Sequence, residues 1–329
     1  MKVLVTGAAG FIGSHLCDSL LGDGIQVKGL DIVPKSKALN LKSALKSSFF
    51  EYIERDITIS SGLPEYFSGV ETVFHLAAIA DIVPSIQSPE RYFNSNVIGT
   101  FNVVNSCRLN KVQRIIYTAS SSCYGIPEEV PTSENCRINP QYPYALTKHL
   151  GEELLMHWAK VYDLSVISLR LFNVFGPRSR TNGTYGAVFG VFLAQKLANM
   201  PLTIVGDGNQ TRDFTYVSDV VSALQKSIIN EHVGIINIGL GKAHSINYLA
   251  SLIGSRTIHI PKRPGEPDTT LANIEKATEI LDWKPKVTFE EGVSRVLSEI
   301  EYWRTAPVWT PKTIEEATRP WFQSLGKKD

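Results

Sequence analysis

The sequence predicts an α/β protein built on a doubly wound parallel sheet, with a smaller lobe formed by the C-terminal part of the chain. Short apolar strand candidates alternate with stretches of helical periodicity through the first half of the chain. The strand candidates carry apolar residues on both of their faces, which is typical of a sheet that helices cover on both sides. After Arg170 the sequence becomes rich in glycine, proline and polar residues, and this change marks the smaller lobe.

The elements follow from the pattern in chain order. A β-branched run at residues 2–6 predicts the first strand, and apolar residues at helical spacing from Ile12 to Leu21 predict the first helix. Gly22 and Gly24 end that helix. Because the strands are parallel, right-handed crossovers should join them. Further strands are expected at 24–31, 50–53, 70–76, 114–118, 164–169 and 233–239, and further helices at 97–109 and 144–158.

The two lobes are expected to share the chain in alternating segments. The sheet lobe takes residues 1–170 and 213–240, and the smaller lobe takes residues 171–212 and 241–329. The chain is expected to finish in helix. Loop and turn signals in the smaller lobe lie at 173–186, 206–209 and 261–267.

The composition narrows the class of protein. The 329 residues are 43% hydrophobic and 20% charged with a net charge of +1, which is typical of a soluble globular protein and gives no reason to expect a nucleic acid or a membrane as partner. No run of about 18 apolar residues predicts a membrane span. The four cysteines lack the spacing of a metal site, so no metal is expected. The first residues lack the architecture of a signal peptide, so we expect a cytoplasmic protein with buried thiols.

The loop between the first strand and the first helix predicts a dinucleotide site. Gly7, Gly10 and Gly13 allow a tight turn there, and they let backbone N–H groups and the helix dipole approach a pyrophosphate. The spacing is G-x-x-G-x-x-G and not the commoner G-x-G-x-x-G, but its place between strand and helix favours dinucleotide binding over a plain turn. The sheet is therefore predicted to be of the Rossmann type.

Polar residues at the ends of the next strands predict which dinucleotide binds. Asp31 ends the second strand at the distance expected for a carboxylate that binds the ribose 2′-hydroxyl. A carboxylate there repels a 2′-phosphate, so NAD is predicted and not NADP. Asp56, which closes the third strand, either accepts a hydrogen bond from the adenine amino group or is an ordinary turn residue.

The fourth strand ends in His75-Leu76-Ala77-Ala78, where small residues let the backbone approach a cofactor closely. His75 itself is expected to be a packed histidine and not a catalyst. Asn96 stands at the start of the next expected helix, where it either caps the helix or orients a water molecule in the active site.

A catalytic set is predicted after the fifth strand. Tyr144 and Lys148 are four residues apart in a helical segment, so they share a face of the helix. A cation favours the phenolate, so Lys148 is expected to lower the pKa of Tyr144 from about 10 toward neutrality and make it a base for a hydroxyl group. Ser120, Ser121 and Ser122 follow the fifth strand at the carboxyl edge, where open parallel sheets bind ligands. A serine hydroxyl is expected beside Tyr144.

Segments along nearly the whole chain carry a family resemblance. They are TGAAGFIGSHL at 6–16, HLAA at 75–78, SSSCYG at 120–125, YxxxK at 144–148, NVFGPR at 173–178, RDFTYV at 212–217 and RPGE at 263–266. In this order they resemble the extended short-chain dehydrogenase/reductases, in particular the NAD-dependent nucleotide-sugar epimerase and dehydratase family. The number of ordered matches makes the resemblance specific.

The resemblance implies roles for the catalytic and cofactor residues. Tyr144 would take the proton of the sugar 4-hydroxyl with Ser120 beside it, and Lys148 would bind the nicotinamide ribose and hold Tyr144 ionised. Hydride would pass from sugar C4 to NAD and leave a 4-keto sugar. The expected cofactor contacts are Gly7, Gly10, Phe11, Ile12, Gly13, Asp31, Asp56, Ile57, Leu76, Ala77, Ala78, Asn96, Tyr144 and Lys148.

The resemblance places the nucleoside-diphosphate sugar against the smaller lobe. Asn173, Arg212 and Arg263 match contacts with the diphosphate and the nucleotide, and Glu266 matches an acid that binds the nucleotide ribose. Arginine forks suit the charge of a diphosphate. Thr270 stands at the position that gates substrate size in the family, and its small side chain leaves room for a 2-N-acetyl group. Further expected substrate contacts, which suit a C6 carboxylate, are Ser121, Ser122 and Arg180.

Ser121 and Ser122 distinguish this sequence from those of two branches of the family. Dehydratases that resemble it carry an Asp-Glu pair there, and decarboxylases carry a Glu, so neither elimination nor decarboxylation is assigned. We expect NAD-dependent 4-epimerisation of a UDP-sugar through a transient 4-keto intermediate. The sugar stays open among UDP-glucose, UDP-N-acetylglucosamine and UDP-glucuronate. The alternatives are an NDP-sugar 4-dehydrogenase or reductase with net NAD turnover, and a nucleotide-sugar-binding module without catalysis.

The helices at 97–109 and from Tyr144 onward are apolar beyond what one face of a sheet needs. Family members pair these helices into a four-helix bundle. The resemblance therefore implies a homodimer.

Overall fold

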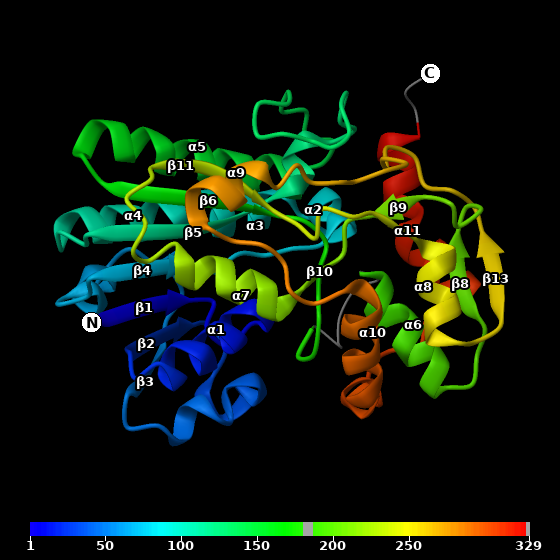
Figure 1. The fold of residues 1–329 in the computed structure, drawn as a ribbon, viewed down its shortest axis with the longest axis horizontal. Coiled ribbons are helices and arrows are strands. Elements are labelled where there is room, and N and C mark those ends of the chain that lie inside the picture. The colour runs from blue at the N-terminus through cyan, green and yellow to red at the C-terminus, as the bar shows by residue number, and fades with distance from the viewer. Residues whose placement is uncertain (180–186, 327–329) are drawn as a thin grey trace.

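The computed structural model describes residues 1–179 and 187–326, and its centre is a parallel sheet (Figure 1). The sheet has seven strands in the order β11-β6-β5-β4-β1-β2-β3, and all neighbouring strands run parallel. They confirm the predicted fold class and the expected strands. The strands are β1 (Lys2–Thr6), β2 (Gln26–Asp31), β3 (Phe50–Glu54), β4 (Thr72–His75), β5 (Arg114–Ser120), β6 (Ser165–Leu171) and β11 (Gly234–Ile238).

The chain winds in both directions from the middle of this sheet. It runs outward from β1 through β2 to β3, returns to β4 on the other side of β1, and continues outward through β5 and β6 to β11. Thr6 at the end of β1 therefore lies level with Leu30 of β2 and His75 of β4. The connections diverge at this point, so the carboxyl ends of β1 and β4 border the crevice where such sheets bind ligands.

Helices cover both faces of the sheet (Figure 1). On one face α1 (Phe11–Gly22) packs against α7 (Val217–Lys226), and on the other α4 (Gly99–Leu109) packs against α5 (Pro143–Tyr162). Val3 and Val5 of β1 point into the first core, and Leu4 points into the second. This alternation follows from the twofold repeat of a strand, and it explains why the strand is apolar on both faces.

The helix expected at 97–109 begins earlier than its apolar pattern. Helix α3 (Pro89–Phe93) leads through a π-helical turn, η5 (Asn94–Ile98), into α4 without a break, and α2 (Ile82–Gln87) precedes them. Asn96 lies inside the π-helical turn, so the interpretation of Asn96 as a helix cap is wrong. Helix α5 starts at Pro143, whose fixed φ suits the first turn of a helix.

The smaller lobe is assembled from segments on both sides of β11. Its larger elements are α6 (Val188–Leu197), β8 (Leu202–Val205), α8 (Ile246–Ile253), β13 (Thr257–Ile260), α10 (Phe289–Ser298) and α11 (Pro311–Leu325). Strands β8 and β13 pair in parallel. Two short strand pairs complete the arrangement. β7 (Val174–Phe175) pairs with β10 (Thr215–Tyr216) where the lobes meet, and β9 (Thr211–Arg212) pairs with β12 (His244–Ser245) within the smaller lobe.

The remaining elements are short. They are α9 (Glu275–Leu281) and the 3-10 helices η1 (Lys35–Lys37), η2 (Leu39–Leu41), η3 (Ala44–Lys46), η4 (Leu63–Phe67), η6 (Ser121–Tyr124) and η7 (Ile300–Trp303). Within residues 1–179 and 187–326, no helix combines the length and the apolar character that crossing a membrane requires.

A cluster of buried rings, here named the aromatic joint, connects the lobes; it consists of Phe175, Phe189, Phe214, Tyr216 and Phe289. Phe175 of β7 stacks on Phe189 of α6 with ring centroids 4.5 Å apart, and Phe214 stacks on Phe289 of α10 at 5.1 Å. Phe175 and Phe289 meet edge to face at 5.8 Å and tie the two stacks together. Each such contact contributes about 0.5–1.5 kcal/mol beyond burial, so the joint fixes the smaller lobe against the sheet.

Candidate active site

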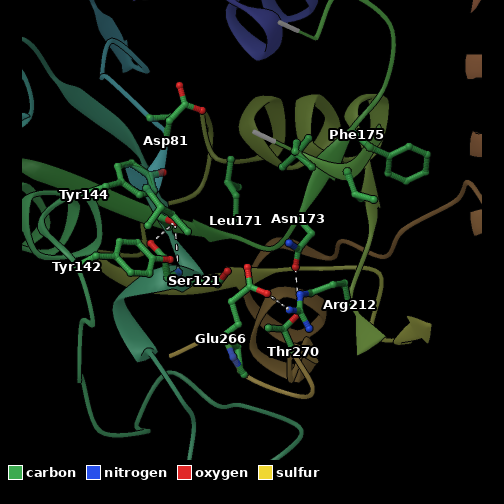
Figure 2. A pocket seen from close by; sticks show the side chains of 18 of the residues that line it. Asp81, Ser121, Tyr142, Tyr144, Leu171, Asn173, Phe175, Arg212, Glu266 and Thr270 are labelled. Atoms are coloured by element: carbon green, nitrogen blue, oxygen red, sulfur yellow. Dashed lines mark hydrogen bonds and ion pairs between the residues drawn. The ribbon is translucent and has the colours of Figure 1, made fainter. Parts of the chain in front are cut away.

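A cavity of about 620 Å³ lies at the carboxyl edge of the sheet and is lined by both lobes. Figure 2 shows Tyr142 and Tyr144 on one side of it and Arg212, Glu266 and Thr270 on the other. Most of the predicted catalytic and substrate residues therefore meet in one place. The predicted residues that line it are Phe11, Ile12, Leu76, Ala78, Ser120, Ser121, Ser122, Tyr144, Lys148, Asn173, Arg212, Arg263, Glu266 and Thr270. Arg180 lies outside the described residues.

The glycine loop connects β1 to α1 with almost no spare room. Gly7 has φ +72°, and a Cβ added to it would lie 2.8 Å from the backbone nitrogen of Ala77. A Cβ on Gly13 would lie 2.1 Å from the carbonyl oxygen of Gly7. Gly10 is the N-cap of α1 and no side chain occupies that cap. The backbone N–H groups at the start of α1 are thus left for an anion, which fits the predicted pyrophosphate site.

Asp31 connects the end of β2 to the glycine loop. Its carboxylate accepts hydrogen bonds from the backbone nitrogens of Ala9 at 2.9 Å and Val33 at 3.0 Å. Burial raises the pKa of Asp31, and these backbone hydrogen bonds lower it in part. Each carboxylate oxygen has a second lone pair, so this geometry is compatible with the predicted bond to a ribose hydroxyl.

Asp56 and Ile57 follow the end of β3. Asp56 accepts a hydrogen bond from the backbone nitrogen of Thr58 at 2.8 Å, which is the geometry of an ordinary turn residue. Ile57 is buried and packs closely against Gly99 of α4. Their contacts with the cofactor stay predictions.

His75 and Asn96 hold backbone in place. His75 is fully buried between the hydroxyls of Thr6 at 2.8 Å and Thr100 at 2.9 Å, and burial lowers its pKa to about 3, so it is the packed histidine that was expected. Asn96 accepts a hydrogen bond from the backbone nitrogen of Ile79 at 2.8 Å and donates to the carbonyl oxygen of Ile79 and the hydroxyl of Thr147. Asn96 therefore ties the chain after β4 to α5.

Helix α5 is held on the sheet by a buried ion pair. Arg170 of β6 donates hydrogen bonds to both carboxylate oxygens of Glu152, and Ser168 donates to the same carboxylate at 2.7 Å. Arg170 also donates to the hydroxyl of Tyr124 at 2.9 Å. Because Glu152 lies one turn beyond Lys148, this network fixes the helical face that carries Tyr144 and Lys148.

Tyr144 hydrogen-bonds to Ser120, and the Ser120 hydroxyl lies 2.7 Å from that of Ser122. Burial raises the pKa of Tyr144, the bond to Ser120 lowers it, and the charge of Asp81 raises it further. The net pKa is higher than that of a free tyrosine. The expected lowering of the Tyr144 pKa is therefore wrong for the protein without a cofactor, because burial is the largest influence on this pKa and raises it.

Lys148 is buried in the cavity wall. Its Nζ lies 4.2 Å from the centre of the Tyr117 ring, and burial lowers its pKa to about 7, although the charge of Glu152 acts in the opposite direction. A lysine with a strongly lowered pKa and a tyrosine with a raised pKa in one cavity are typical of a catalytic site.

The other side of the cavity carries two arginines and one acid. Glu266 lies between Arg263, whose Nη1 is 2.9 Å from its Oε1, and Arg212, whose Nη2 is 3.9 Å from its Oε2. Thr270 donates a hydrogen bond to the side-chain oxygen of Asn173 at 3.0 Å. Two guanidinium groups side by side suit a diphosphate, as the sequence predicts.

Several cavity residues were missed by sequence reasoning, among them Tyr142, Trp321 and Asp81. Tyr142 stacks on Tyr144 with ring centroids 6.4 Å apart and planes 7° apart. Trp321 of α11 lies 6.3 Å from Tyr142, and Asp81 lines the cavity with a φ of +92°. The position of Tyr142, two residues before Tyr144, is a signal that could have placed it at the site. No local sequence pattern connects Trp321 with this site.

An open parallel sheet with a glycine loop at its switch point, and with Ser120, Tyr144 and Lys148 beside it, defines a dinucleotide-dependent enzyme of the short-chain dehydrogenase/reductase type. The model of the NAD dependent epimerase/dehydratase family matches residues 3–239. The chain belongs to this family. Its cofactor is NAD, as the sequence predicts.

Relatives of the chain act on several UDP-sugars. A UDP-glucose 4-epimerase of Mycolicibacterium smegmatis is 37% identical over 315 residues, which are 92% of this chain and 99% of that protein. The crystal structure of UDP-glucuronic acid 4-epimerase from Bacillus cereus, with UDP-glucuronic acid and NAD, is 34% identical with a TM-score of 0.84 and covers 93% of this chain and 99% of its own. A UDP-N-acetylglucosamine 4-epimerase from Methanobrevibacter ruminantium M1 is 33% identical with a TM-score of 0.85, covering 91% and 98%.

Proposed function

We propose that this protein is an NAD-dependent 4-epimerase of a UDP-sugar, which works through a transient 4-keto sugar. The observation that carries the proposal is a single cavity in which Ser120, Tyr144 and Lys148 face Arg212 and Arg263. The two positions after Ser120 are serines, so the site has no acid where dehydratases and decarboxylases of the family need one. The similarity to 4-epimerases over more than nine tenths of the chain supports the same reaction.

The side chains divide the proton transfers between them. When bound, NAD would supply the hydride acceptor and a positive charge. Tyr144 takes the proton of the 4-hydroxyl, directly or through Ser120, whose hydroxyl is bonded to Tyr144 and Ser122. Lys148 adds a second positive charge that favours the phenolate. After the 4-keto sugar turns over, Tyr144 would return the proton to the oxygen on C4, and the hydride would return from the cofactor to the opposite face of C4.

The sugar nucleotide is proposed to lie across both lobes. Residues 1–170 and 213–240 hold NAD, and residues 171–212 and 241–329 hold the nucleoside diphosphate. Arg212 and Arg263 bind the diphosphate, and Glu266 binds the ribose. Thr270 leaves space beside C2, which keeps UDP-N-acetylglucosamine among the candidates with UDP-glucose and UDP-glucuronate.

We also propose that the protein works in the cytoplasm as a homodimer. Large apolar side chains on the outer side of the α3 to α5 layer are partly exposed, which supports an interface there. They are Phe93, Ile98, Phe101, Leu146, Val161 and Tyr162.

The reaction is tested by incubating the NAD-loaded protein separately with each of the three UDP-sugars and separating the 4-epimers. We expect a 4-epimer of at least one sugar without net formation of NADH. Tyr144→Phe should lower turnover by about 100-fold or more, because it removes the proton acceptor. Tyr248→Phe removes an exposed hydroxyl that bonds to Glu290, and it should retain activity.

Two other outcomes would favour the alternatives. Net accumulation of NADH with a product two hydrogens lighter would identify an NDP-sugar 4-dehydrogenase. Turnover that Tyr144→Phe leaves unchanged would refute the assignment of the base, and binding without turnover of any sugar would identify a binding module.

A further inference from the structure

The C-terminal helix α11 reaches the cavity through Trp321. It begins with a capping box between Thr310 and Thr313, and it buries Ile314, Thr318 and Trp321 along one stripe. The helix packs against α2, which follows β4 in the sheet lobe (Figure 1). Through Trp321 it lines the same cavity as Tyr144 and Arg263. Helix α11 therefore connects the smaller lobe to the sheet lobe beside the site.

Trp321 contacts both sides of the cavity. Only 3% of its surface is exposed, and its Nε1 donates a hydrogen bond to the carbonyl oxygen of Pro264 at 2.7 Å. Its ring centre lies 5.3 Å from the guanidinium carbon of Arg263. The Trp321 ring also contacts the ring of Tyr142, which stacks on Tyr144. One side chain thus joins the arginine loop to the aromatic pair that includes the proposed base.

The loop at 261–267 depends on α11 for its position. It has no regular secondary structure after β13, and Gly265 has a φ of +71°. Trp321 holds Arg263 and Pro264, and Leu325 lies 3.6 Å from the place of a Cβ on Gly265. Helix α11 therefore contacts three consecutive residues of the loop, including the arginine that faces the cavity.

We propose that Trp321 is a positioning residue for a nucleoside diphosphate, and this inference rests on the proposed function. It holds the guanidinium of Arg263 by a cation–π contact and fixes the loop through Pro264, so that the diphosphate meets an arginine already in place. Its contact with Tyr142 joins this end of the site to the reacting end. The role requires a ring and an indole N–H at this position.

The test measures the binding of UDP to the NAD-loaded protein by calorimetry. Trp321→Phe keeps a ring and loses the bond to Pro264, so we expect the Kd to rise about threefold. Trp321→Ala also loses the cation–π contact, and we expect a rise of about tenfold or more. Trp283→Phe is the matched control, because Trp283 is buried and donates its Nε1 to the carbonyl oxygen of Asp219 at 3.0 Å but does not line the cavity. It should keep the Kd of the wild type.

Steady-state kinetics give a second readout that a general loss of stability would not produce. In Trp321→Phe we expect KM for the UDP-sugar to rise with the Kd of UDP, while kcat stays within about twofold of the wild type and bound NAD is unchanged. Unchanged UDP binding in both Trp321 variants, or an equal loss in Trp283→Phe, would overturn the inference. Weaker UDP binding in the Trp321 variants of a protein that epimerises no UDP-sugar would refute the proposed reaction and support the role of Trp321.

Discussion

Burial sets the charge states of the two proposed catalytic side chains. It raises the pKa of Tyr144 and lowers the pKa of Lys148 to about 7, so near neutral pH the tyrosine is protonated and the lysine is divided between its two forms. Both groups are held in the less charged form by the same apolar surroundings. An added positive charge near Tyr144 would reverse its shift, and bound NAD brings such a charge to the site.

The lowered pKa of Lys148 predicts a pH dependence of stability. The unfolded chain keeps the ordinary lysine pKa of about 10.4 and binds the proton more tightly than the folded protein. Above pH 7 the free energy of unfolding of the NAD-free protein should therefore rise with pH, by about 1 kcal/mol per unit from this residue. Lys148→Met should lack this rise when urea unfolding is measured at about pH 7 and 9.

Lys42→Met removes an exposed lysine and serves as the control for this measurement. It should keep the slope of the wild type. If the wild type and Lys148→Met have the same slope, the pKa of Lys148 is not lowered in the folded protein.

The place of a site residue was predictable where the residue belongs to a motif next to a predicted strand or helix. Ser120, Tyr144 and Lys148 follow from the fifth strand and the next helix, and they meet in one cavity. The direction of the Tyr144 pKa shift was not predictable, because sequence spacing reveals a neighbouring cation but not the depth of burial. Trp321 was missed for a related reason, since its partner Tyr142 is far away in the chain and no local pattern joins them.

The turn between β1 and α1 shows how closely an element can depend on the absence of a side chain. Gly13 and Gly22 both belong to α1, and only Gly13 faces the backbone of the glycine loop. A Cβ on Gly22 would meet nothing within 4 Å. The two glycines of one helix therefore have different requirements.

Gly13→Ala should push α1 away from the carbonyl of Gly7 and disturb the N–H groups that face the pyrophosphate. We expect a loss of about 1–3 kcal/mol in the free energy of unfolding and a protein that purifies with little NAD. Gly22→Ala should be neutral or stabilising by up to about 1 kcal/mol with its NAD retained, because alanine favours a helix. Urea unfolding and the NAD content of the purified proteins distinguish them. Normal NAD content in Gly13→Ala would contradict the pyrophosphate assignment.

Elements were predictable to the extent that their pattern is local. The strands of the sheet carry continuous apolar runs, and each expected strand is present. The helix from Pro89 to Leu109 was only partly foreseen, because the π-helical turn at Asn94–Ile98 breaks the 3.6-residue repeat on which the prediction rests. Helix α11 was expected only as part of a helical finish, because its buried stripe gives no sign of which surface it covers.

The molecule as a whole presents an apolar surface over α4 and α5. Phe101 and Trp158 meet there edge to face at 5.8 Å, and Trp158 also contacts Tyr162. An exposed cluster of this kind supports the proposed homodimer.

Phe101→Glu should convert the proposed dimer to a monomer at micromolar concentration, because each subunit would bury an unpaired charge in the interface. Light scattering coupled to size exclusion measures the mass directly. Ile229→Glu places the same charge on an 89% exposed isoleucine outside these helices and should leave the mass unchanged. A wild-type protein that is monomeric would refute the dimer.

The aromatic joint limits how ligands can be exchanged. Opening the lobes like a hinge would separate Phe214 from Phe289 and Tyr216 from Phe175, and it would expose rings that are now buried. Wetting several such rings costs far more than thermal energy, at about 1.5–3 kcal/mol for each. We therefore expect sugar nucleotides to enter and leave while the lobes keep their placement. The 4-keto sugar would then reorient inside a cavity of constant shape, beside the cofactor that had accepted its hydride.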